Sequence, residues 1–229
     1  MNAAQLPLDL GHRPAMEAED FLVADSNAEA VGWLDRWPGW PAPALAIHGP
    51  PGCGKTHLTR VWQVRSRAVA VTAAALADAD LTSLLAATGA VAIDDADQLA
   101  GAAAERALFH LYNMARDEGG HLLLTGRTPP ARWKIDLPDL ASRLKAAPAV
   151  AVEEPDDALL SAVLVKLFAD RQLRIGAEVI AFAVPRMERS FAAARRLVAE
   201  IDATSLAHRR PVTVHLTRAV LDQGIEKEG

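Results

Sequence analysis

One stretch of sequence decides the fold: Gly49-Pro50-Pro51-Gly52-Cys53-Gly54-Lys55-Thr56. It fits G-x-x-x-x-G-K-[ST] at every fixed position and lies between an apolar run, Ala44–His48, and a helical pattern that begins at Lys55. Glycines let backbone amides turn toward phosphate oxygens, and the helix that follows adds the positive end of its dipole. Lys55 is expected to reach the β- and γ-phosphates, and the Thr56 hydroxyl to bind Mg²⁺. The loop therefore predicts a purine nucleotide, ADP or ATP, as ligand.

Cys53 lies inside this loop and is the only cysteine of the chain, so no internal disulfide can form. Two interpretations of this residue stay open. A helix N-terminus lowers a thiol pKa, which would allow redox control, while a small residue also simply fits a tight turn.

Short apolar runs rich in β-branched residues recur on both sides of the loop and alternate with helical patterns. The runs are Ala44–His48, Ala68–Thr72, Ala90–Asp94, His121–Thr125 and Ala149–Val152. The helical patterns between them are Lys55–Arg65, Asp78–Ala87, Ala103–Asp117 and Leu137–Ala147. Strand–helix alternation of this kind is typical of a parallel sheet covered on both faces. We therefore expect an α/β domain with a five-stranded parallel sheet over residues 21–154.

The pattern changes after Glu154. Pro155 breaks the chain, and Asp156-Asp157 offers a helix N-cap. From there only helices are predicted, at Asp157–Arg171, Ala177–Met187, Ser190–Ala207 and Val214–Gln223. A small all-helical lid domain is thus expected over residues 155–229. Residues 1–20 are polar, contain Pro and Gly, and are expected to form a flexible leader.

Composition narrows the class of protein further. A chain of 229 residues that is 51% apolar can bury one sizeable core and a small lid. The net charge of −5 disfavours direct sequence-specific DNA binding, which usually needs a basic face. The longest apolar stretches, such as Ala68–Ala77, are too short to span a membrane, and no secretory signal is recognised. Together with the single cysteine, this predicts a cytoplasmic protein.

The run Ala90–Asp94 ends in two carboxylates, Asp94 and Asp95. In proteins with this kind of phosphate loop the first acid of such a pair coordinates Mg²⁺, and the second orients or activates water. We therefore expect Asp94 to bind the metal and Asp95 to act on water. The second acid is often Glu, and Asp95 is one methylene shorter, which would reduce its catalytic reach.

The combined pattern resembles the AAA+ class of P-loop NTPases. The continuation Thr56-His57-Leu58 is similar to the branch formed by the bacterial replication initiator DnaA and its shortened relatives, the Hda (HdaA) family. The resemblance extends over nearly the whole chain. It implies a negative regulator of replication initiation that stimulates hydrolysis of DnaA-bound ATP, with DnaA as partner and with ADP promoting the active form. Nucleotide contacts would continue from the loop to His57.

The leader contains Gln5-Leu6-Pro7-Leu8-Asp9-Leu10, which resembles the peptide by which Hda-like proteins bind the DNA polymerase III sliding clamp, its beta subunit. An extended segment with one polar anchor and apolar side chains suits insertion into a groove, and a flexible leader suits this mode of binding. The clamp contacts implied by the resemblance are Gln5, Leu6, Leu8 and Leu10.

The resemblance also implies the walls of the nucleotide site. The segment Phe21-Leu22-Val23, followed by Ser26-Asn27, is similar to the family's entry segment, whose apolar residues contact adenine. The same residues also fit a strand that leads into a helix cap. Leu122–Pro130 matches the strand and turn that carry the polar "sensor 1" position. Thr125 is the conservative candidate there, while Arg127 stands where relatives often have an acid.

Two arginines complete the set of residues implied by the resemblance. Asp139–Leu144 is similar to the family's arginine-finger segment, so Arg143 would enter a neighbour's site and stabilise charge on the transferred phosphoryl group. Arg189 begins the pattern Arg189–Ala194, which matches the "sensor 2" position that reaches bound phosphates from the lid. Arg195 and Arg196, further along, are expected to be surface charges.

Two alternative functions stay open. A free-standing ATPase of helicase-loader type would use the complete set of Lys55, Thr56, Asp94 and a working Asp95. An adaptor would bind DnaA without stimulating hydrolysis. The initiator carries a helix-turn-helix domain after its lid, whereas this sequence ends at Gly229, which favours the regulator. AAA+ domains commonly associate head to tail, so a homodimer or a higher assembly is also expected, while a membrane partner is not.

Overall fold

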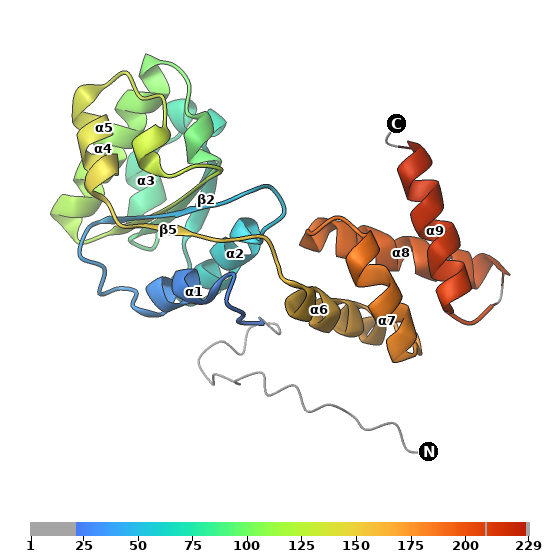
Figure 1. Cartoon of the computed structure of the whole chain (residues 1–229). Coiled ribbons are helices and arrows are strands. Elements are labelled where there is room, and N and C mark those ends of the chain that lie inside the picture. The colour runs from blue at the N-terminus through green and yellow to red at the C-terminus, as the bar shows by residue number, and fades with distance from the viewer. Residues whose placement is uncertain (1–21, 209, 228–229) are drawn as a thin grey trace.

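A computed structural model of the chain describes residues 22–208 and 210–227. The predicted leader, the clamp-type residues Gln5, Leu6, Leu8 and Leu10, and the predicted adenine contact Phe21 lie outside the described residues. Within them the chain forms a mixed region up to Ala151 and a helical region after it (Figure 1).

The strands make one parallel sheet in the order β2-β3-β4-β1-β5, which confirms the predicted five-stranded sheet. Their bounds are β1 Ala44–His48, β2 Val69–Thr72, β3 Ala90–Asp94, β4 His121–Gly126 and β5 Ala149–Ala151. Because all strands run the same way, the ends of β1, β3 and β4 meet at one edge. There His48 lies beside Gly126 in the register of β1 with β4. The phosphate loop therefore emerges beside the turn that follows β4.

Helices cover both faces of the sheet. Those of the mixed region are α1 Ala28–Asp35, α2 Lys55–Ser66, α3 Leu81–Ala86, α4 Ala102–Glu118 and α5 Pro138–Ala146, with short 3-10 turns η2 Ala73–Asp78, η3 Ala96–Gln98 and η4 Pro130–Arg132. One apolar cluster joins α1 and α2 to the sheet, and another joins α3, α4 and α5 to its opposite face. The central strands are buried on both sides, which explains their uninterrupted apolar runs.

The predicted helix at Asp78–Ala87 is shorter than expected. Residues up to Asp78 form the 3-10 turn η2, and α3 starts only at Leu81. Asp80 supplies the cap, because its Oδ1 accepts a hydrogen bond of 3.1 Å from the Ser83 amide. An Asp that captures a backbone amide favours a helix start at that point over a continuous helix.

The helical region contains α6 Asp157–Asp170, α7 Ala177–Ala183, η5 Val184–Arg186, α8 Phe191–His208 and α9 Val214–Lys227. These helices enclose an apolar cluster of their own, and Figure 1 shows them beside the sheet rather than on it. The expected cap at the start of α6 is present: Asp156 Oδ1 accepts a hydrogen bond of 2.7 Å from the Leu159 amide. The predicted domain boundary near residue 155 stays a prediction. Among the described residues, no helix combines the length and apolarity needed to cross a membrane.

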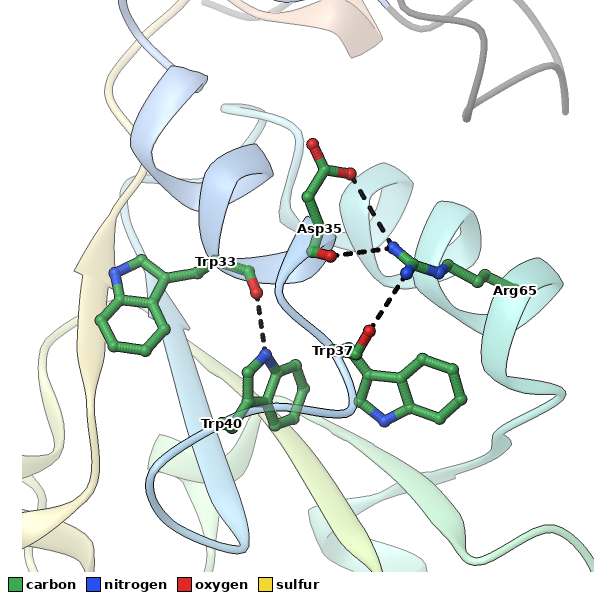
Figure 2. Close-up of polar contacts among 5 residues, drawn as sticks. All are labelled: Trp33, Asp35, Trp37, Trp40 and Arg65. Carbon is green, nitrogen blue, oxygen red and sulfur yellow. Dashed lines mark hydrogen bonds and ion pairs between the residues drawn. The ribbon is translucent and has the colours of Figure 1, made fainter.

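The loop from α1 to β1 is fastened to α2 through hydrogen bonds to backbone oxygens (Figure 2). The Arg65 guanidinium donates to the carbonyl oxygens of Asp35 and Trp37 at 3.2 and 3.1 Å. Trp40 Nε1 donates to the Trp33 carbonyl at 2.8 Å, and its ring stacks on Trp62 of α2. The helix that begins with the phosphate-loop lysine is thereby held at its far end.

Candidate nucleotide-binding site

The loop between β1 and α2 has a backbone that only glycine accommodates at three positions. Gly52 and Gly54 adopt φ values of +78° and +109°. A Cβ at Gly49 would lie 2.1 Å from the Val152 carbonyl oxygen, and a Cβ at Gly54 would lie 2.9 Å from the Phe191 ring. The loop is therefore a cradle of backbone amides with no room for side chains at its glycines, which is what close approach of a phosphate chain requires.

Lys55 lies at the start of α2 with its side chain folded over the loop. Its Nζ donates to the carbonyl oxygens of Gly49 and Pro50 at 2.7 and 2.9 Å. Pro51 and Thr56 are exposed beside it. An ammonium group held among loop carbonyls can exchange those partners for phosphate oxygens with little movement of the backbone, so the predicted role of Lys55 is compatible with its position.

The two acids predicted at the end of β3 differ in their surroundings. The Thr125 hydroxyl, fully buried on β4, donates to Asp94 Oδ1 and accepts a hydrogen bond of 3.1 Å from the Asp95 amide. Asp94 is therefore fixed by a side chain thirty-one residues away. Asp95 is exposed and adopts a left-handed backbone, with φ +52°. Thr125 and Asp94, which were predicted separately, are thus joined by a hydrogen bond.

A cavity of about 360 Å³, here called the lid-side cavity, opens between the loop and the helical region. From the loop side it is lined by Leu22, Gly52, Gly54, Lys55, Thr56 and His57. Its apolar wall on the helical side comes from Leu159, Val163 and Leu167 of α6 and from Phe191 and Ala192 of α8. Lys166, Asp170 and Arg195 add charged groups to the lining. The predicted wall residue Val23 does not line it and packs instead against the α1–α2 cluster.

The helical side of this cavity was not predicted residue by residue. Leu159, Val163 and Leu167 recur at helical spacing on α6, which indicates a buried face but not what the face covers. Arg195 was expected to be a surface charge. It is exposed, and it also lines the cavity.

The helical region contacts the loop directly. The Phe191 amide donates to the Gly52 carbonyl at 3.3 Å, and a Cβ on Gly52 would lie 2.5 Å from Ser190 Cβ. Ser190 also caps α8, since its hydroxyl accepts a hydrogen bond of 3.1 Å from the Ala193 amide. The left-handed glycines of the loop are therefore required by packing against α8 as well.

Arg189 precedes α8, because Ser190 provides the cap and the helix starts at Phe191, one residue after the predicted start. Its guanidinium pairs with Asp157 Oδ1 at 2.7 Å, and it does not line the lid-side cavity. A contact with bound phosphate would require Arg189 to exchange this exposed ion pair, which contributes little stability. Its "sensor 2" role stays a prediction.

Cys53 is buried within the loop. Burial raises the pKa of its thiol, against the opposing charge of Lys55. A protonated and buried thiol is a poor nucleophile, so these observations favour the packing interpretation over redox control.

Arg143 lies in the last turn of α5 and packs on α4. Its guanidinium lies 4.7 Å from the Phe109 ring centroid and 5.6 Å from that of Tyr112, and it donates to Asn113 Oδ1. These contacts hold the half-buried side chain against α4, and α5 itself lies on the side of the core away from α6–α9 (Figure 1). Arg143 does not line the lid-side cavity.

Within the described parts of the chain, no group of three or more His, Cys, Asp or Glu side chains is arranged to hold a metal ion. The oxygens of Thr56 and Asp94 are of the type that Mg²⁺ prefers, and Mg²⁺ commonly takes its other ligands from water and phosphate. The residues present thus fit a metal that is bound together with a nucleotide.

No family model matches the chain. Its fold is similar to that of domain III of the replication initiation protein DnaA from Thermotoga maritima, with a TM-score of 0.75 at 19% identity over 89% of this chain and 94% of that one. DnaA bound to AMPPCP and single-stranded DNA matches with a TM-score of 0.68 at 18% identity over 86% and 69% of the two chains. The FIGL-1 AAA domain in complex with ADP matches with a TM-score of 0.63 at 18% identity, over 86% of this chain and 82% of that one. The chain therefore has a DnaA-like AAA+ fold, in agreement with the fold that the sequence predicts.

Proposed function

We propose that the chain binds ADP or ATP together with Mg²⁺ at the loop Gly49–Thr56. The observation that carries this proposal is the glycine cradle, with Gly52 and Gly54 in left-handed conformations around an inward-folded Lys55. Loop amides and Lys55 would hold the phosphates, and the apolar lid-side cavity would take the nucleoside. Thr56 and Asp94 would hold Mg²⁺, which supplies charge neutralisation on the phosphates. The DnaA and FIGL-1 structures named above contain AMPPCP and ADP.

We further propose that this nucleotide-bound chain, with ADP in the active form, is a negative regulator of replication initiation of the Hda type. In this role it stimulates hydrolysis of ATP bound to DnaA by inserting Arg143 into that partner's site. Two features support a role in trans: Arg143 lies outside the lid-side cavity of its own chain, and Phe109, Tyr112 and Asn113 hold its guanidinium in one place. A pre-positioned guanidinium loses little entropy on docking.

The test measures phosphate release from DnaA alone, from this chain alone, and from both together with the clamp loaded on DNA. Stimulation only in the full mixture is the expected result. Arg143→Ala should lower that stimulation by about a thousandfold, within the range known for arginine fingers, and should leave nucleotide binding unchanged. Lys145→Ala, an exposed cation on the same helix, is the matched control. Full stimulation by Arg143→Ala would refute the finger role.

Clamp binding through Gln5, Leu6, Leu8 and Leu10 is proposed from the sequence alone. Deleting residues 1–10 should abolish capture of the chain on immobilised clamp, while ADP affinity stays unchanged because the loop and both sides of its cavity are retained. Capture that survives the deletion would exclude this segment as the clamp contact.

A free-standing ATPase of helicase-loader type is the second candidate, and one observation favours it: Asp95 is exposed beside an Asp94 that Thr125 holds in place, so the acidic pair is complete. Turnover by the isolated chain that Asp95→Asn abolishes would support this candidate. If the chain is an adaptor without either activity, phosphate release from every mixture will equal that from DnaA alone.

A further inference from the structure

The first turn of α4 carries a buried acid, Glu105, which is 4% exposed. Its carboxylate accepts hydrogen bonds from two backbone amides: Oε1 from Asp136 at 3.1 Å and Oε2 from Leu137 at 2.7 Å. Among the residues that the structure describes, no cation pairs with it. A buried carboxylate is costly unless its oxygens are hydrogen-bonded, so these two amides are the groups that stabilise it.

The two amides belong to the segment that leads into α5. Leu137 is the N-cap residue of that helix, and its own side chain provides no capping hydrogen bond. Pro138 follows as the first residue of the helix and has no N–H to donate. A carboxylate near a helix N-terminus also interacts favourably with the helix dipole. Glu105 of α4 therefore holds the place at which α5 begins.

The last turn of α5 is held by the same helix. The Arg143 guanidinium lies 4.7 Å from the Phe109 ring centroid and donates to Asn113 Oδ1. Glu105, Phe109 and Asn113 follow one another at intervals of four residues, so they lie along one stripe of α4. The start of α5 thus faces the start of this stripe, and Arg143 faces its end.

Between these two ends the contact of α5 with α4 is apolar, and the helices lie side by side (Figure 1). Leu140 and Leu144 of α5 are buried in the cluster that contains Leu108 and Leu111 of α4. Apolar attraction is non-directional, whereas hydrogen bonds require defined distances and angles. The position of α5 along α4 is therefore fixed chiefly by the hydrogen bonds at its ends, and those to Glu105 are the ones that do not involve Arg143 itself.

We propose that Glu105 is a positioning residue for Arg143: by binding the two amides before α5, it fixes where along α4 the guanidinium is presented to a partner. This inference rests on the proposed stimulation of DnaA by Arg143. Glu105 does not line the lid-side cavity, so it acts through α5 and not on the nucleotide of its own chain. Displacement of a group by about 1 Å from a reacting centre can cost about a hundredfold in rate.

The first measurement is phosphate release from ATP-bound DnaA, with the clamp loaded on DNA, against the concentration of this chain. Glu105→Gln keeps the size of the side chain but turns one acceptor oxygen into an NH₂ donor, which cannot bind a backbone N–H. The maximum rate should fall about tenfold or more, while the half-saturating concentration and the affinity of the chain for ADP stay within about twofold. Glu118→Gln, which changes an exposed acid of the same helix, is the matched control and should alter none of these values.

The second measurement needs no partner. Tyr112 is the only tyrosine of the chain, and the Arg143 guanidinium lies 5.6 Å from its ring centroid. Burial raises the pKa of Tyr112, whereas the charges of Arg143 and Arg116 lower it. If Glu105→Gln lets Arg143 move away, this pKa should rise toward its value in Arg143→Ala, as measured by NMR titration of the ring. Loss of the negative charge at residue 105 would by itself lower the pKa, so a rise reports on Arg143.

A second variant guards against loss of folding. Glu105→Asp keeps the charge and both acceptor oxygens but withdraws them by one methylene, and it replaces Glu105→Gln if that variant shows no cooperative unfolding transition. Its maximum rate should fall by a smaller factor, about threefold, again at an unchanged half-saturating concentration.

The outcomes are distinguishable. An unchanged maximum rate in the Glu105 variants overturns the positioning role, and so does a Tyr112 pKa that does not rise in Glu105→Gln. A higher half-saturating concentration at an unchanged maximum rate would make the segment before α5 a docking contact and would overturn it as well. If the parent chain does not stimulate DnaA, the proposed function fails, and the titration of Tyr112 then decides separately whether Glu105 holds Arg143 in place.

Discussion

The two cavities on either side of the phosphate loop differ in what lines them. The lid-side cavity is walled by apolar side chains of α6 and α8, and two of its charged groups, Lys166 and Asp170, pair with each other at 3.1 Å. The other cavity, of about 640 Å³ and called here the β4-side cavity, lies at the start of the loop and is lined by Arg127 and Arg132 and also by Glu153 and Glu154. One side of the loop thus faces an apolar wall, and the other side faces charged side chains of both signs.

The difference has a structural origin. The lid-side wall is contributed by helices more than a hundred residues after the loop, packed onto Gly52 and Gly54 through Ser190 and Phe191. The β4-side wall comes from turns at the edge of the sheet, held by hydrogen bonds to the Gly49 amide and to Asp97. Packing between distant helices and the loop thus positions the lid-side wall, whereas the register of the strands positions the β4-side wall.

The largest effect should come from Lys55, which lines the lid-side cavity and donates to the carbonyl oxygens of Gly49 and Pro50 at the edge of the other cavity. Lys55→Ala is expected to weaken ADP and ATP binding by about a hundredfold or more, because a charged donor to the phosphates is lost. Isothermal calorimetry measures this. Lys145→Ala, on α5, is the control, and an unchanged affinity in the Lys55 variant would remove the basis of the comparison.

Gly54→Ala should come next and should affect the lid side first. The added Cβ would lie 2.9 Å from the Phe191 ring at a φ of +109°, so both strain and a clash oppose it. We expect a loss of about 2 kcal/mol in the free energy of unfolding together with weaker nucleotide binding. Gly89→Ala is the control, since φ is +69° there and nothing lies within 4 Å. An equal loss of unfolding free energy in both variants would show that contact with the Phe191 ring adds nothing to the cost of the Gly54 substitution.

Phe191→Ala should separate the two sides. It removes apolar wall from the lid-side cavity and leaves the cations of the β4-side cavity untouched, so ADP and ATP affinity should fall together, by about tenfold. Competition with a fluorescent ADP analogue gives both values. A selective loss of ATP affinity in this variant would contradict the assignment of the nucleoside to the lid side.

The smallest effect concerns His48. Arg132→Ala should raise the pKa of His48 toward 6.5 because one of the charges that lower it is removed, while burial and Lys55 continue to act. Titration of the ring protons by NMR measures the change. No movement of the pKa would show that the charge of Arg132 does not act on His48.

The same histidine predicts a pH dependence of stability. A lowered pKa means that the folded chain binds this proton less readily than the unfolded chain, so the stabilising contribution of His48 is complete above pH 6.5 and is lost as the pH falls below it. His48→Asn should flatten the unfolding free energy measured against pH in that acidic range. An unchanged slope would assign the pH dependence to other groups.

Much of this site could be predicted from sequence because its signals are local. The loop pattern, the apolar runs and the carboxylates at the end of β3 depend on residues close in the chain, and the parallel sheet follows from their alternation. The cap at Asp156 was likewise predictable, since a side chain that accepts from an amide three residues on is a local event.

What the sequence by itself determined is thus the AAA+ core, the loop and the order of its elements. Only the tertiary structure decided that Thr125 is bound to Asp94, that Arg189 pairs with Asp157, that Arg195 lines the lid-side cavity, and that Arg127 and Arg132 line one cavity with Gly49. The physical reason is that a side chain's partners are set by packing and hydrogen bonding between segments distant in the chain. Periodicity and motif spacing place a residue on its own strand or helix and carry no information about the segment it will face.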